Sequence, residues 1–122
     1  MIKDIGFVCY PVMDMAKARA FYEGVLGLKT NSEFDGSNNA AWVEYNVGSG
    51  TFALGCWPDQ WKPSSEGPTA ALEVEDLNAM VKKLKEAGVL FKIEPMDFPN
   101  CSMAVIHDPD KNCITLHQKK KS

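Results

Sequence analysis

The sequence predicts an α+β fold in which two βαβββ modules form curved mixed sheets around a cleft. One observation is an internal repeat of about 62 residues, because Val12-Met13-Asp14 and Val74-Glu75-Asp76 each open a helical stretch. Another is that Phe52-Ala53-Leu54 ends the first half much as Ile114-Thr115-Leu116 ends the second. Two copies indicate a pseudo-symmetric domain rather than a solenoid, so the cleft between the halves is the natural place for a ligand.

The first module is predicted over residues 1–57. Its helix, from Met15 to Leu26, has apolar residues at the 3.6-residue period, an Asp14 cap before it and Gly27 after it. Runs rich in β-formers surround this helix. The strands are predicted at 5–11, 28–34, 40–47 and 51–57, with a turn at 35–39.

The linker is predicted over residues 58–68, which contain Pro, Gly and Ser, and the second module over 69–122. Asp76 caps a second helix, which runs through Ala87 and ends at Gly88. The order of the first module is thereby repeated, and residues 1–122 are expected to form one domain. The strands are predicted at 69–74, 90–94, 101–107 and 113–118, with an irregular connection at 95–100 and a turn at 108–112.

The composition is that of a soluble globular protein and excludes several functions. The chain of 122 residues is 45% hydrophobic and carries a net charge of −3, which does not favour a nucleic-acid partner. No stretch approaches the roughly 18 apolar residues that a membrane span requires, and the N-terminus lacks the pattern of a signal peptide. We therefore expect a cytoplasmic protein without a membrane partner.

The cysteines and histidines have mainly structural interpretations. Four cysteines lie in strand-like runs without a C-x-x-C pair, so buried, reduced thiols are expected, with a catalytic cysteine as the alternative. His107 ends a strand beside a turn and is interpreted as structural. His117 lies two residues after Thr115, on the same side of its strand, and is a candidate for the rim of a pocket.

Three groups of motifs carry a resemblance to a known family. The first module contains Val8-x-x-Pro11-Val12-x-Asp14, Ala20-Phe21-Tyr22 and Val25-Leu26-Gly27-Leu28. The second contains Val74-x-Asp76-Leu77, Leu84-Lys85-x-Ala87-Gly88-Val89 and Asp108-Pro109-Asp110-Lys111-Asn112-x-Ile114. In this order and spacing they resemble the vicinal oxygen chelate superfamily, which includes glyoxalase I, bleomycin-resistance proteins and extradiol dioxygenases. The family more often has Gly at the place of Lys111.

The resemblance implies a paired βαβββ fold with a pocket inside each curved sheet. The pocket would be built by both modules of one chain or by modules of two chains, and because family members are often homodimers, a homodimer is expected. Metal-dependent members hold a divalent ion with His, Gln or Glu side chains from the first and last strands of each module. The matching positions in this chain are Phe7, Ala53, Thr69 and Thr115.

These four residues predict that the chain binds no metal and no other cofactor. Phe and Ala have no donor atom, and Thr hydroxyls are poor ligands without a carboxylate partner. An aromatic pocket is what remains. Trp42 and Glu44 share one strand face, the small Ala53 leaves room beside Trp57 on another, and no core requires Trp61 in the linker.

The candidate ligand-binding residues come from both modules. The alternative for the aromatic residues is that they fill the core. Aromatic faces with one carboxylate favour flat or cationic organic molecules, but a one-residue shift of its strand would turn Glu44 to the other side, so its orientation stays open. The predicted set is Phe7, Cys9, Trp42, Glu44, Ala53, Trp57, Trp61, Thr69, Met103, Thr115 and His117.

The first functional hypothesis is a non-catalytic binding protein that resembles the bleomycin-resistance branch. It would hold a planar or cationic small organic molecule in a hydrophobic cleft, as in antibiotic resistance, without a metal and without catalytic residues. The alternative is a metal-dependent enzyme, either a glyoxalase-like lyase or isomerase or a dioxygenase. A third hypothesis is metal-free acid–base catalysis by Glu44 or His117. The missing metal ligands favour the first.

Overall fold

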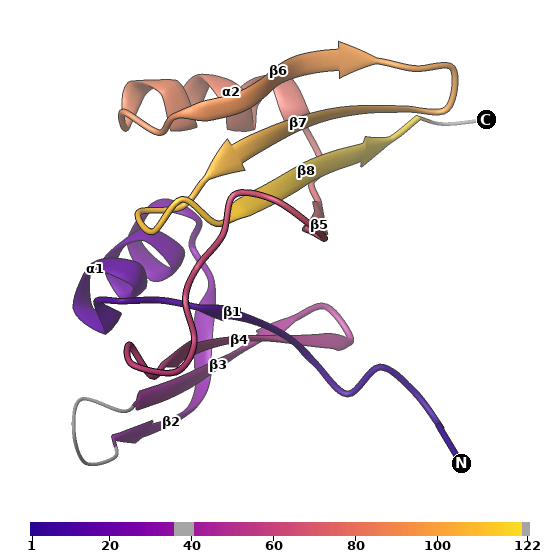
Figure 1. The fold of residues 1–122 in the computed structure, drawn as a ribbon. Helices are drawn as coiled ribbons and strands as arrows, with labels where there is room; N and C mark the ends of the chain where they lie inside the picture. The colour runs from indigo at the N-terminus through magenta and orange to yellow at the C-terminus, as the bar shows by residue number, and fades with distance from the viewer. Residues whose placement is uncertain (36–40, 121–122) are drawn as a thin grey trace. The chain divides into compact units, whose positions relative to one another are not determined.

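The computed structural model describes residues 1–35 and 41–120, and its chain divides into two compact units, Met1–Pro63 and Ser64–Ser122 (Figure 1). Most of the turn predicted at 35–39 lies outside the described residues. In the part of the chain that is described, no helix is both long enough and apolar enough to cross a membrane.

The first unit has the predicted βαβββ order. Its sheet has the strand order β1-β4-β3-β2, in which β1 is parallel to β4 and the other pairs are antiparallel. The helical segment follows β1 and packs on β4. The elements are β1 (Val8–Pro11), α1 (Met15–Arg19), the π-helix η1 (Ala20–Val25), β2 (Lys29–Asp35), β3 (Ala41–Val47) and β4 (Gly50–Cys56).

The second unit repeats this topology with the strand order β5-β8-β7-β6. One prediction for it was wrong, because the residues from Pro95 to Asp97 belong to a strand rather than to an irregular connection. Pro95 falls at a register shift between Ile93 and Met96 on an edge strand, where a missing N–H donor is tolerated. The elements are β5 (Ala70–Glu73), α2 (Leu77–Glu86), β6 (Phe91–Asp97), β7 (Cys101–His107) and β8 (Cys113–Lys119).

The sequence repeat is reproduced at the start of each helix. The Asp14 carboxylate accepts a hydrogen bond from the N–H of Lys17 (3.1 Å), and that of Asp76 accepts one from the N–H of Ala79 (3.0 Å). Both aspartates have extended backbone angles, with φ of −138° and −139°. Each therefore satisfies one of the N–H groups that a helix start leaves without a partner, as predicted.

One face of each sheet packs against the helix of its own unit. In the first unit, the fully buried Tyr22 of η1 contacts Phe52 of β4, with ring centroids 5.3 Å apart. In the second unit, Leu84 of α2 and Leu116 of β8 are both fully buried, and Figure 1 shows α2 lying along its sheet. Each sheet consequently has an opposite face that its own helix does not cover.

The first helix differs from the regular α-helix that the apolar period predicted. At the end of η1, the N–H of Leu26 donates to the carbonyl of Phe21, five residues earlier (2.9 Å). In the second unit, the N–H of Ala87 donates to the carbonyl of Lys83, only four residues earlier (3.1 Å). The first helix therefore widens in its last turn.

An extra residue explains the wider turn. Gly27 follows the Asp14 cap by 13 positions, whereas Gly88 follows the Asp76 cap by 12, and both glycines have the positive φ of a helix end (76° and 79°). Because the two ends of each helix are equivalent, the first unit accommodates one more residue between them. The π-helical turn absorbs that residue.

Candidate functional site

The strand register places Glu44 on the face of the first sheet that its helix leaves uncovered. Val43 and Tyr45 of β3 are buried on the helix side, so Trp42 and Glu44 between them point to the other side. The indole Nε1 of Trp42 donates to Oε2 of Glu44 (2.8 Å) and holds the carboxylate on this face. The sequence left the orientation of Glu44 open, and the structure places its side chain on the uncovered face, where it can contact a ligand.

Gly55 forms the floor beneath three tryptophan rings. It lies opposite Trp42 in the sheet, and a Cβ atom at Gly55 would be 2.8 Å from the ring of Trp61, 3.1 Å from that of Trp57 and 3.2 Å from that of Trp42. Real Cβ contacts essentially never fall below 3.0 Å. The three indoles can therefore converge on the sheet only because residue 55 has no side chain.

The three indoles belong to a larger aromatic face. The rings of Phe7 and Trp42 meet edge to face with centroids 5.4 Å apart, and those of Trp42 and Trp57 lie 6.0 Å apart. Phe34 of β2 lies directly opposite Trp42 and is 58% exposed. The sequence prediction missed Phe34, although its aromatic character in a predicted strand was a usable signal. We define the aromatic face as Phe7, Phe34, Trp42, Trp57 and Trp61.

Burial and the charge of Glu44 act together on Cys9. Cys9 lies opposite Ala53, and Ala53 lies opposite Glu44, so the three residues form one row across the sheet. Burial, and secondarily the negative charge of Glu44, raise the pKa of the Cys9 thiol to about 12. Cys9 is therefore a neutral thiol at neutral pH, which disfavours a nucleophilic role and suits a wall of a binding site.

Glu44 is a half-buried carboxylate for which the described residues provide no basic partner. Among residues 1–35 and 41–120, the carboxylates of ion pairs include Glu23, Glu33 and Glu73, but Glu44 forms none. Its carboxylate accepts a hydrogen bond from the indole of Trp42, which is uncharged. The aromatic face therefore carries a negative charge that no described cation neutralises.

The remaining predicted residues lie in the second unit, with Thr69 directly before β5 and the others on the sheet. The hydroxyls of Thr69 and Thr115 are hydrogen-bonded to each other (2.8 Å). Nδ1 of His117 is 2.6 Å from Oε1 of Glu73, and Met103 lies opposite His117 in the sheet. The structure thus gathers the predicted residues into two sets, one in each unit.

The residues at the family's metal positions do not fit a divalent ion. In the first unit Phe7 and Ala53 offer no donor atom, and in the second the hydroxyls of Thr69 and Thr115 bind each other instead. Among the described residues, no three His, Cys, Asp or Glu side chains gather as a metal-binding group.

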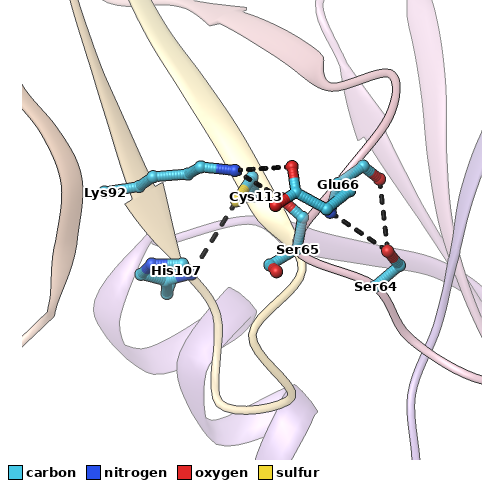
Figure 2. A network of polar contacts seen from close by, with 6 residues as sticks. All are labelled: Ser64, Ser65, Glu66, Lys92, His107 and Cys113. Carbon is cyan, nitrogen blue, oxygen red and sulfur yellow. Dashed lines mark hydrogen bonds and ion pairs between the residues drawn. The ribbon is translucent and has the colours of Figure 1, made fainter.

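A cysteine–histidine contact lies outside the predicted set (Figure 2). The buried Cys113 donates to the carbonyl of Ser65 (3.4 Å), and its Sγ is 3.8 Å from Nδ1 of His107. The ammonium of Lys92 donates to the same carbonyl (2.6 Å) and pairs with Glu66 (3.3 Å). These contacts hold Ser65 and Glu66 against the second sheet, which gives Cys113 a structural role.

A cavity of about 140 Å³ lies at the start of α2. Leu77 and Asn78 of α2 line it together with residues of the second sheet, which are Pro95, Met96, Asp97, Ser102 and Gln118. Oε1 of Gln118 accepts a hydrogen bond from the N–H of Leu77 (2.7 Å), so this amide oxygen supports the helix. None of the predicted site residues lines the cavity.

Comparisons with known proteins agree with the fold. A family model described as the Glyoxalase/Bleomycin resistance protein/Dioxygenase superfamily matches residues 4–116. The uncharacterized protein YetH of Bacillus subtilis (strain 168) is 28% identical over 120 residues, which cover 97% of this chain and 100% of YetH.

Solved structures share the same architecture. TnmS3, an antibiotic binding protein from Streptomyces sp. CB03234, is 25% identical with a TM-score of 0.77, and the match covers 98% of each chain. A member of the glyoxalase/bleomycin resistance protein/dioxygenase superfamily from Sphaerobacter thermophilus DSM 20745 is 27% identical with a TM-score of 0.76, over 97% of this chain and 98% of that one.

Proposed function

The chain belongs to the Glyoxalase/Bleomycin resistance protein/Dioxygenase superfamily, and on that premise we propose that it is a metal-free binding protein for small organic molecules. The ligand is a flat or cationic molecule that stacks on the aromatic face and is released unchanged. TnmS3, similar over nearly its whole length, is described as an antibiotic binding protein, which supports binding as the activity of this chain as well.

The observation that carries the proposal is that Glu44 has no basic partner among residues 1–35 and 41–120. Leaving a half-buried carboxylate without a cation costs free energy, because burial weakens its hydration. A cationic ligand beside Glu44 would offset this free-energy cost by pairing with the carboxylate. The same cation would gain about 0.5–2 kcal/mol from each aromatic ring whose face it meets.

The shape of the aromatic face supports a flat ligand. Rings in offset or edge-to-face contact are the geometry in which aromatic surfaces associate most favourably, and Phe7 and Trp42 already meet in this way. Phe7, Phe34 and Trp61 are 50%, 58% and 37% exposed, so a ligand can bury more of each ring. That burial is worth about 25 cal/mol for each Å² of apolar surface.

The residues at the family's metal positions support binding without a metal. Metal-dependent members of the family have a metal-coordinating side chain at the position of Phe7. In this chain the Phe7 ring would instead contact the bound organic molecule, and Ala53 would leave space beside that molecule. The thiol of Cys9, neutral because its pKa is about 12, adds an apolar wall.

We also infer that the protein acts in the cytoplasm as a homodimer. None of its four cysteines, all of which lie among the described residues, forms a disulfide, as expected in a reducing compartment, and homodimers are frequent in the family that the sequence resembles. Light scattering of the purified protein should give twice the chain mass of 13.5 kDa. A mass of one chain would contradict the dimer.

Tryptophan fluorescence quenching tests the ligand class. The probes are proflavine, a planar cation, and 9-anthracenecarboxylate, a planar anion of similar size. We expect proflavine to bind more tightly, and Trp57→Ala to weaken its binding about tenfold, or 1.4 kcal/mol. Glu44→Gln should weaken proflavine binding and leave the anion unaffected or improved. Phe98→Ala, at a surface aromatic residue of the second unit, is the matched control.

Three outcomes would contradict the proposal. Equal proflavine affinity in the wild type, Trp57→Ala and Glu44→Gln would remove the aromatic face from the site. A stoichiometric divalent ion that survives dialysis would overturn metal-free binding. Conversion of a bound ligand into a product, detected by chromatography after incubation, would favour the enzymatic alternative.

A further inference from the structure

We propose that the second sheet carries a site for a soft monovalent cation, Cu(I) or Ag(I), formed by Met96, Met103 and His117. This site is separate from the aromatic face, to which the metal-free binding proposed above refers, and the two proposals stand independently. It arises on the face of the second sheet that α2 leaves uncovered.

The strand register brings the three side chains into one row. Met96 of β6 lies opposite Met103 of β7, and Met103 lies opposite His117 of β8. Opposed residues of antiparallel strands have Cα atoms about 4.5–5.5 Å apart and point to the same side. Ala104 and Leu116, the neighbours of Met103 and His117, are buried on the α2 side, so the row lies on the other side.

Glu73 orients the imidazole for a ligand. It lies opposite His117 on β5, and its Oε1 is 2.6 Å from Nδ1. A carboxylate beside Nδ1 favours the tautomer in which Nδ1 carries the proton, which leaves the lone pair on Nε2. Since β5 and β7 flank β8 on opposite sides, Nε2 faces away from Glu73 and toward the side of Met103.

Glu73 is itself held in place. Its second oxygen, Oε2, accepts a hydrogen bond from the N–H of Lys119 (2.7 Å). A carboxylate that fixes the ring of a ligating histidine is the usual outer partner in metal sites, and its charge also compensates that of the cation.

The donor atoms select the kind of ion. Thioether sulfur and imidazole nitrogen are soft or borderline donors, which suit Cu(I) and Ag(I), whereas Mg²⁺ and Ca²⁺ require oxygen ligands. Access is open, because Met96 is 47% exposed and the His117 side chain is 30% exposed. The equivalent row of the first sheet offers no such donors.

An anaerobic Cu(I) titration against the chelator bicinchoninate tests the site. We expect Met103→Leu and His117→Phe each to lower the Cu(I) affinity at least tenfold, and Glu73→Gln about tenfold through loss of ring orientation. Met80→Leu on α2 is the matched control and should leave the affinity unchanged. Because Leu and Met have similar volumes, the Met103→Leu variant should fold, which its thermal unfolding curve checks.

Thiols are the competing explanation, and Cys101 is the nearest, two residues before Met103 on the same strand. We expect Cys101→Ser to keep the Cu(I) affinity. Ag(I) should also shift the methyl NMR signals of Met96 and Met103 but not that of Met80. Affinity lost in Cys101→Ser and kept in Met103→Leu would overturn the proposal, and so would methionine signals that do not respond to Ag(I).

Discussion

The two units share a backbone pattern and differ in the row of side chains across their uncovered faces. In the first sheet the row reads Pro11, Gly55, Trp42 and Phe34. In the second sheet the equivalent row reads Glu73, His117, Met103 and Met96. The same four places hold an aromatic surface over a glycine in one unit, and an oriented imidazole with two thioethers in the other.

The difference shows that different residues determine the fold and the binding chemistry of each unit. The buried core residues that face the helix, such as Leu54 and Leu116, are apolar in both units, since each sheet must bury one face to be stable. The opposite face is free of that demand, so its side chains can be chosen for a ligand. The contrast extends to charge, because Glu44 lacks a basic partner among the described residues while Glu73 has His117.

The largest effects should come from equivalent core positions and should be alike in the two units. Leu54 and Leu116 are both fully buried. We expect Leu54→Ala and Leu116→Ala each to lower the free energy of unfolding by about 2–5 kcal/mol, through lost burial and a residual cavity. If the two units form the single domain that the sequence predicts, urea unfolding should show one transition in both variants. Two separate transitions would show that the units unfold independently.

An intermediate effect should appear only in the first unit, at the floor of the aromatic face. Gly55→Ala forces the Trp61 and Trp57 rings away from the sheet, and we expect a loss of about 1–3 kcal/mol in unfolding free energy together with weaker proflavine binding. Gly50→Ala on the same strand is the control, since its Cβ would meet only an ordinary contact at 3.5 Å. Equal free energies of unfolding for Gly55→Ala and Gly50→Ala in urea would contradict the proposed role of Gly55 beneath the tryptophan rings.

The smallest effects should again be equal in the two units. Asp14→Ala and Asp76→Ala each remove a helix cap, and we expect each to cost about 1 kcal/mol. Asp14→Asn and Asp76→Asn retain a capping oxygen and should restore most of that stability. Thermal unfolding of the four variants gives the comparison. A loss of stability in only one of the two alanine variants would show that the two helix starts are not equivalent.

Local signals in the sequence were sufficient for much of the fold. The Asp14 and Asp76 caps, the glycines that end the helices and the alternation along the strands all act over a few residues, and the structure follows them. Lys111 is a further case: its φ is 67°, a left-handed conformation that Gly, the residue expected there from the family resemblance, adopts without strain.

Features that depend on the pairing between strands could not be predicted from the sequence. Glu44 could be assigned to a face only after the register of β3 was known, because a shift by one residue reverses every side chain. The membership of Phe34 in the aromatic face depends on its pairing with Trp42 across a register shift in β2. The contact between His117 and Glu73 joins residues 44 positions apart.

The π-helical turn gives the first unit a tolerance that the second lacks. Between Tyr22 and Leu26 a residue can be gained or lost while both helix ends keep their places, because the turn can widen or narrow. In α2, which has no such turn, a lost residue would rotate everything beyond it by about 100°. Natural variation in length should therefore concentrate in the first helix of such molecules, well away from the tryptophans.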